Sequence, residues 1–168
     1  GGLVAGKGGL GWRVNGLGRL ARSEETGAAK LTARAGLKAA LGKERLSMGD
    51  PAHVPAGRYG RQALRNLGLW RGVRVQAVFG ASVRDALALL ARGQGRYAIA
   101  YATDASVHGG LAPAAAFPGH SHDAIVYPLA LLRERDGGPA RAVFRYLQGG
   151  AARQIFEQYG FTFLPKPR

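Results

Sequence analysis

The chain has 168 residues, no cysteine, and 24 Lys and Arg against 10 Asp and Glu, which gives a formal net charge of +14 at pH 7. This length suits one domain or two small lobes, and the lack of cysteine excludes disulfides, thiol catalysis and cysteine-ligated metals. The positive charge invites a nucleic-acid interpretation, but the basic residues are spread along the chain in neither a run nor a single helical stripe. We therefore expect the charge to reflect overall arginine usage, and no nucleic-acid partner.

Residues 1–36 differ in composition from the rest of the chain. They are rich in glycine, contain Trp12 as their only aromatic residue and show no sustained hydrophobic period, so we expect an irregular segment. The opening GGLVAGKGGLG matches two phosphate-loop patterns, G-x-x-x-x-G-K and G-x-G-x-x-G. The strand before such a loop and the helix after it are not recognisable, because Gly16 and Gly18 would interrupt a helix, and we expect no anion site here.

Regular elements follow this segment. The patterning predicts a short helix over 31–41 and then an alternation of strands and helices, which favours an α/β fold with mostly parallel sheets. Glycines after three of the helices, at positions 68, 93 and 160, are typical of helix ends. The predicted strands cover 45–49, 73–80, 96–102, 111–118 and 124–132, and the predicted helices cover 54–68, 82–93, 139–148 and 151–160.

Two of the predicted helices begin in a way that suits an anion. Pro55 occupies the first helical position of one, and the free N–H of Ala56 comes directly after it beside a side chain too small to obstruct a ligand. Ser82 and Asp85 form a capping box that places the N–H of Val83 at the start of the other. Each helix follows a strand, so both starts are expected at the same edge of a parallel sheet, where α/β proteins bind ligands. Two ordinary, well-capped helices remain the alternative.

The sequence resembles the periplasmic molybdate-binding proteins of ABC transporters between about Leu37 and Phe163. The resemblance is carried by GDPAHVPAGRYGRQALRNLGLW, SVRDALALLARG, IAYATDA, AAFPGHSHDAIVYPLALL and AARQIFEQYGF, in the order and spacing of that family. It implies a type II periplasmic-binding-protein fold with two lobes that close on molybdate or tungstate. It also implies an ABC permease as partner, a periplasmic location, a monomer, and no cofactor besides the oxyanion ligand.

The resemblance also implies which residues hold the oxyanion. Residue by residue, the family's ligands fall on the backbone N–H groups of Ala56 and Val83 and on the hydroxyl of Tyr101. All three are neutral donors, which suits a fully deprotonated anion. The family's other ligands are hydroxyls in a first lobe that is not recognisable in this sequence, so we expect a truncated chain with weakened binding.

The expected organisation follows from this comparison. Residues 1–36 form the irregular segment, residues 37–104 form the α/β lobe with the two helix starts, and residues 105–168 supply hinge strands and C-terminal helices of the other, incomplete lobe. The fold class is thus α/β and type II-like, with a second lobe and the returning C-terminal part of a first lobe. No signal peptide and no stretch of about 20 apolar residues is recognisable, and an exported protein would be represented here by a mature or partial form.

Other functions find less support. His108, His120 and His122 with Asp123 could suggest a metal site, but PGHSHD is typical of a solvated surface turn, and we expect no metal. The C-terminal aromatic residues fall at helical spacing, which favours core packing over base stacking. No nucleophile elbow and no carboxylate pair at a helix start indicates an enzyme. A basic nucleic-acid-binding module and a degenerate remnant without activity remain alternative interpretations.

Overall fold

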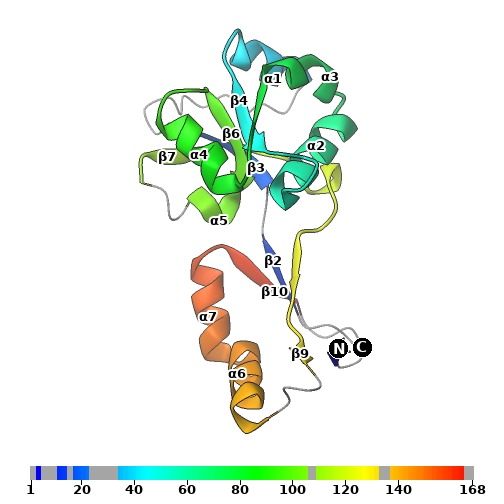
Figure 1. Ribbon diagram of the computed structural model, residues 1–168, viewed down its shortest axis with the longest axis vertical. Coiled ribbons are helices and arrows are strands. Elements are labelled where there is room, and N and C mark those ends of the chain that lie inside the picture. Colours follow the sequence, from blue (N-terminus) through cyan, green and yellow to red (C-terminus); the bar gives the residue numbers. More distant parts are fainter. Residues whose placement is uncertain are drawn as a thin grey trace. The chain divides into compact units, whose positions relative to one another are not determined.

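The computed structural model describes residues 3–4, 11–14, 17–22, 34–105, 109–132 and 137–164. The chain forms two compact units (Figure 1), one of residues 16–123 and one that combines residues 1–15 with residues 124–168. The expected boundaries near residues 36 and 104 differ from this division. The strand over 111–116 belongs to the larger unit because it pairs with a strand from residues 17–22.

The larger unit is built on one mixed sheet of five strands in the order β5-β4-β6-β3-β7. Strand β4 lies parallel to both of its neighbours, β5 and β6, whereas β3 lies antiparallel to β6 and β7. The expectation of a mostly parallel sheet therefore holds only for β5, β4 and β6. The strands are β3 (Leu17–Arg22), β4 (Leu46–Gly49), β5 (Ala77–Gly80), β6 (Tyr97–Tyr101) and β7 (Leu111–Ala116).

Helices α2 (Pro55–Asn66) and α4 (Val83–Ala91) cover opposite faces of this sheet. Successive strand residues point to opposite faces. Ile99 of β6 lies against α2, where a Cβ at Gly60 would fall 2.9 Å from its Cγ2. Its neighbours Ala98 and Ala100 form a buried cluster with leucines of α4. This doubly wound packing confirms the α/β fold class and fixes the direction in which both helices start.

Two of the predicted helices of the larger unit are followed by a glycine whose backbone adopts the left-handed conformation that ends a helix. Gly68 and Gly93 adopt positive φ values of 68° and 72°, after α2 and α4 respectively. The predicted strand over 73–80 begins only at Ala77, because residues before it form α3 (Trp70–Val73) and a 3₁₀ turn over Arg74–Gln76. The remaining helices of this unit are α1 (Arg34–Leu41) and α5 (Ala102–Ala105).

Among its described residues, the smaller unit has two antiparallel sheets and two helices. One sheet has the order β10-β2-β8, and the other pairs β1 with β9. The strands are β1 (Leu3–Val4), β2 (Gly11–Val14), β8 (Val126–Pro128), β9 (Leu131–Leu132) and β10 (Phe161–Leu164), and the helices are α6 (Gly138–Gln148) and α7 (Gly150–Gln158). The expectation of an irregular segment over 1–36 is thus wrong for its three strands, which are held by pairing with distant segments.

The aromatic residues near the C-terminus are only partly in a core. The ring of Phe156 meets that of Phe161 edge to face at 5.5 Å, and Phe161 meets Tyr127 in the same way at 5.8 Å, which confirms packing for these residues. Tyr146 and Tyr159 are instead about half exposed, at 54% and 50%. In the part of the chain that the structure describes, no helix is long and apolar enough to cross a membrane.

Candidate functional site

At the turn between β4 and α2, the strand and the helix lie so close together that only glycine fits at two positions. A Cβ on Gly57 would lie 2.0 Å from the carbonyl oxygen of Gly49, and a Cβ on Gly49 would lie 2.4 Å from Cγ1 of Val54. Such distances are far inside van der Waals contact, so a larger residue would push the helix away from the strand. The two glycines therefore allow the first turn of α2 to lie directly against the end of β4.

The start of α2 has no capping side chain. Its N-cap residue is Val54, whose side chain has no oxygen, and Pro55 at the next position has no N–H. The first bond of the helix runs from the N–H of Arg58 to the carbonyl of Val54 at 3.0 Å. The amides of Ala56 and Gly57 lie before it, and both residues are buried, with Ala56 fully enclosed. Buried amide groups at a helix start require an acceptor, and an anion is well suited to supply it.

The start of α4 is organised differently. Ser82 accepts a hydrogen bond of 3.1 Å from the amide of Asp85, and its hydroxyl donates to the Asp85 carboxylate at 2.9 Å. The predicted cap by Ser82 is thus confirmed, and the Asp85 carboxylate accepts from the Ser82 hydroxyl rather than from its backbone N–H as in the full capping box. Gly80 closes the turn, since a Cβ there would come within 2.9 Å of the amide nitrogen of Ala86. The cap uses the third amide of the helix and leaves the first, that of Val83, outside this interaction.

The structure brings the elements that carry Ala56, Val83 and Tyr101 to one edge of the sheet. Strands β5, β4 and β6 run parallel, so their carboxyl ends lie at the same edge. α2 follows β4, α4 follows β5, and Tyr101 is the last residue of β6. The backbone of Tyr101 is fixed by a bond of 2.8 Å from its N–H to the Asp104 carboxylate. All three residues belong to the larger unit, and their role as ligands remains a prediction.

The suggested metal cluster does not form in the described part of the chain. His108 lies outside the described residues, and no group of three His, Cys, Asp or Glu among the others could hold a metal ion. The turn that carries His120 is also less solvated than expected. Ser121 is fully buried, and its hydroxyl donates to the carbonyl of Pro118 at 2.6 Å. The glycine-rich opening of the chain lies mostly outside the described residues, so the phosphate-loop patterns stay untested.

The same turn is attached to α2 by three contacts. The Asn66 side chain donates to the Ser121 carbonyl at 3.0 Å, and the amide of Asp123 donates to the side-chain oxygen of Gln62 at 3.0 Å. The ring of His122 lies edge-on to that of Tyr59 at 6.1 Å. These contacts hold the end of the larger unit to α2. No sequence pattern indicated them, because the paired residues are about 60 positions apart.

A doubly wound unit with an uncapped, buried helix start at the carboxyl edge of its parallel strands is the arrangement of an α/β ligand-binding protein. Residues 15–162 match the family model of the bacterial extracellular solute-binding proteins, and the chain belongs to this family. This confirms the class to which the sequence resemblance pointed.

Relatives within the family are similar over about 120 residues. The chain is 42% identical over 123 residues to the molybdate-binding protein ModA of Haemophilus influenzae, covering 73% of this chain and 48% of the relative. It is 40% identical over 118 residues to ModA of Escherichia coli, covering 70% and 46%. The chain therefore spans about half the length of the curated relatives that it matches.

A solved structure confirms the fold. The substrate-binding domain of a putative molybdenum ABC transporter from Clostridium difficile superposes with a TM-score of 0.76 at 20% identity, covering 97% of this chain and 69% of that one. At this level of identity the likeness concerns the fold alone. It extends the match to nearly the whole chain, including segments outside the region of high sequence identity.

Proposed function

We propose that this chain binds molybdate or tungstate and serves as the solute-binding component of an ABC importer in the periplasm, as a monomer and without a further cofactor. The proposal is supported by its membership of the family and by two ModA relatives that are named as molybdate-binding proteins. The proposed ligands are the amides of Ala56 and Val83 and the hydroxyl of Tyr101. A solute-binding role is a binding function, and no catalytic step is required of these residues.

The observation that carries the proposal is the difference between the two helix starts. The start of α4 has a capping serine, whereas the start of α2 has a valine, a proline and then buried amides. Burying an amide without a hydrogen-bond partner costs about 1–3 kcal/mol. A bound oxyanion removes this cost, and the partial positive charge at both helix starts stabilises its negative charge.

The chemistry of the proposed ligands favours a particular protonation state. Backbone amides and a tyrosine hydroxyl donate hydrogen bonds, and none of the three proposed groups is a carboxylate that would accept a proton from the ligand. An oxyanion that is fully deprotonated at neutral pH fits this set, whereas one that keeps a proton leaves that proton without an acceptor. Neutral donors also avoid an ion pair that would slow the release of the anion.

The length of the chain bears on the strength of binding. It covers less than half of the ModA relatives, and the family resemblance implies further hydroxyl ligands in a first lobe. Each charge-assisted hydrogen bond contributes about 1.5–3 kcal/mol, so each such ligand that is absent weakens binding by roughly tenfold or more. We therefore expect this chain to bind more weakly than its longer relatives.

Isothermal titration of the folded chain with molybdate, tungstate and sulfate tests the proposal. We expect saturable binding of molybdate and tungstate, with the Tyr101→Phe variant weaker by about tenfold because it lacks one donor. Circular dichroism establishes that each sample is folded. If molybdate at roughly 10 mM gives neither heat nor a rise in melting temperature with a folded sample, the proposed function is wrong.

A further inference from the structure

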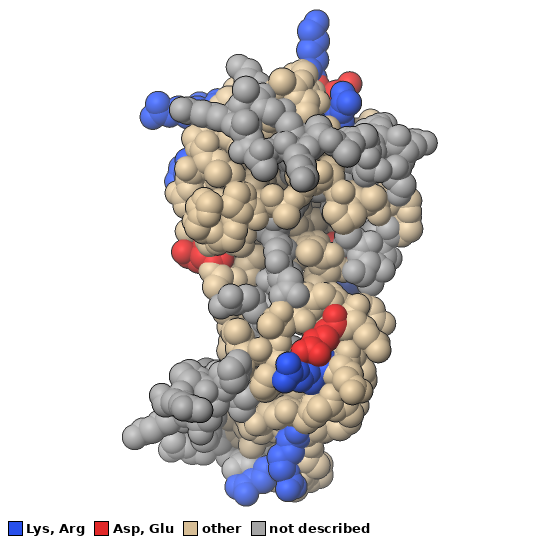
Figure 2. Space-filling view, turned by 180° about the vertical axis from the view of Figure 1, so that it is seen from behind, with Lys and Arg blue, Asp and Glu red and all other residues tan. Residues whose placement is uncertain are grey.

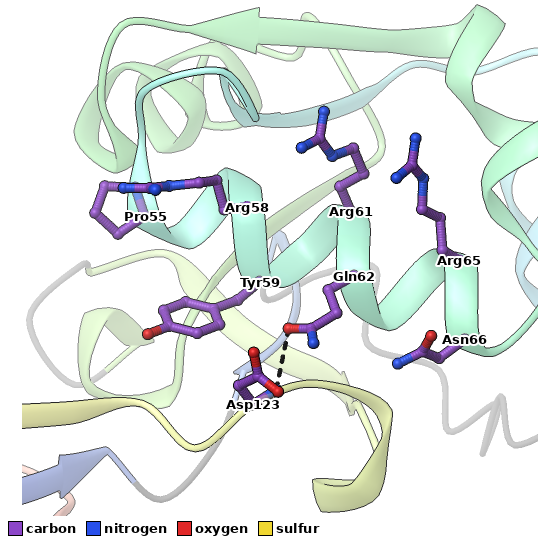
Figure 3. A pocket seen from close by; sticks show the side chains of 8 residues that line it. All are labelled: Pro55, Arg58, Tyr59, Arg61, Gln62, Arg65, Asn66 and Asp123. Carbon is purple, nitrogen blue, oxygen red and sulfur yellow. Dashed lines mark hydrogen bonds between the residues drawn. The ribbon is translucent and has the colours of Figure 1, made fainter.

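The exposed side of α2 carries a row of arginines that the sequence analysis did not recognise. Arg58, Arg61 and Arg65 are spaced three and four residues apart, which places them on one face of the helix. Figure 3 shows Arg61 and Arg65 pointing to the same side of α2, away from Gln62 and Asn66, which point toward the turn with Asp123. Three basic residues are thus aligned on α2, although the basic residues of the chain as a whole form no single helical stripe.

These arginines border two adjoining hollows of the surface, which we call the arginine groove. The first hollow has a volume of about 540 Å³, and the second has a volume of about 750 Å³. Arg65 lines both, so the two hollows are neighbours. The first is lined by Pro55, Arg58, Tyr59, Arg61, Gln62, Arg65, Asn66 and Asp123, and the second by Arg65, Gly68, Trp70, Arg71 and Arg74.

The positive charge of the groove is not neutralised within the described part of the chain. None of its five arginines has an ion pair there, and Asp123 is the single carboxylate among the lining residues. Arg153 of α7, in contrast, pairs with Glu157 at 2.8 Å. On the face shown in Figure 2, the basic side chains of the described residues are dispersed rather than aligned. The groove is thus a local concentration of guanidinium groups.

We propose that the arginine groove binds an acidic peptide segment of a partner protein. Guanidinium groups form paired hydrogen bonds with carboxylates, and Arg58 and Arg65 are separated by about 10 Å along the helix, a distance that three residues of an extended peptide span. The groove therefore fits a segment with several Asp or Glu residues. This inference does not depend on the proposed oxyanion function, since none of the groove's arginines is a proposed ligand of the anion.

The other residues of the groove favour a protein over a lipid surface or a nucleic acid. Tyr59 and Trp70 each line one hollow, and aromatic residues with arginine are the residue types that contribute most to protein interfaces. The amides of Gln62 and Asn66 also border it, and each is already fixed by a bond to the neighbouring turn.

A labelled oligoglutamate peptide tests this proposal by fluorescence anisotropy with the whole chain. Two variants lose the same number of charges, and all substituted residues except the half-buried Arg61 are exposed. The groove variant combines Arg58→Gln, Arg61→Gln and Arg65→Gln. The control variant combines Arg45→Gln, Arg92→Gln and Arg145→Gln. A thermal melt establishes that both are folded, and phosphatidylglycerol vesicles and a double-stranded oligonucleotide serve as alternative anionic probes.

We expect the wild-type chain to bind the peptide, the groove variant to bind it about tenfold more weakly, and the control variant to stay within about twofold of the wild type. Higher salt should weaken the wild-type interaction. Equal losses in both variants would mean that net charge alone attracts the peptide, and would overturn the proposal. So would the absence of peptide binding by the wild type, or a groove variant that loses more affinity for vesicles or for the oligonucleotide than for the peptide.

Discussion

The backbone amide of Asp50 donates a hydrogen bond of 2.9 Å to the carbonyl oxygen of Gly80. This bond joins the end of β4 to the end of β5, directly before the turns that lead into α2 and α4. The two helix starts are therefore fixed relative to each other by the sheet before any ligand is present. Such preorganisation lowers the cost of ordering a binding site, because the donors already lie at one edge.

Replacing Gly57 with alanine should damage this arrangement. The new Cβ would lie 2.0 Å from the Gly49 carbonyl oxygen, so α2 must move away from β4. We expect the free energy of unfolding of the chain to fall by about 1–3 kcal/mol, as for other overpacked sites. The measurement is urea denaturation followed by circular dichroism.

A matched control for this substitution is Gly150→Ala in α7. A Cβ at Gly150 meets no atom within 4 Å, and alanine is the better helix former, so we expect unchanged or slightly higher stability. If Gly57→Ala and Gly150→Ala have the same stability, the close approach of α2 to β4 does not constrain the fold.

We expect the serine cap of α4 to stabilise the folded chain by about as much as helix caps usually do. Ser82→Ala removes the oxygen that accepts from the Asp85 amide at 3.1 Å, and we expect a loss of about 1 kcal/mol in the free energy of unfolding. Ser82→Thr keeps a hydroxyl and should lose less. Denaturant titrations of the three proteins check this order, and an alanine variant as stable as the threonine variant would contradict it.

The contact between α2 and the turn over 119–121 should depend on a donor at Asn66. Its side-chain amide donates to the Ser121 carbonyl at 3.0 Å, and a carboxylate at this position would instead face that carbonyl. We expect Asn66→Asp to lower the free energy of unfolding by about 1 kcal/mol, and by more than Asn66→Ala does. The measurement is urea denaturation at neutral pH.

Acidic conditions provide the control for this prediction. Below about pH 3.9 the new carboxyl is protonated and can donate, so the gap between the aspartate and alanine variants should narrow. If the two variants still differ by the same free energy of unfolding at low pH, repulsion between the new carboxylate and the Ser121 carbonyl does not cause the difference.

The elements around the proposed site could be predicted from local sequence. Pro55 and Ser82 indicate the starts of α2 and α4, and Gly68 and Gly93 indicate their ends, because each residue type favours the backbone conformation that its position needs. The cap by Ser82 followed from the spacing of two residues. The parallel direction of β5, β4 and β6 followed from the alternation of strands and helices, whereas their order in the sheet did not.

Long-range pairing could not be predicted in the same way. Strand β3 contains Gly18 and has no clear alternation, yet it lies between β6 and β7, about 80 and 95 residues away. Residues Arg74–Gln76 have a strand-like pattern but continue from α3 as a 3₁₀ turn. The arginine row of α2 was detectable from its spacing of three and four residues. The net charge of the whole chain does not reveal such a local row.

The amide of Val83 is a proposed ligand of the oxyanion, and the substitution Val83→Pro removes this N–H alone. Proline at the first position of a helix is well tolerated, and the preceding Ser82 has an extended backbone that suits it, so the substitution removes the N–H with little change in the fold. Val83→Ala loses similar packing but keeps the N–H. Isothermal titration with molybdate should show the proline variant about tenfold or more weaker than the alanine variant. Equal affinities of these two variants for molybdate would contradict the account.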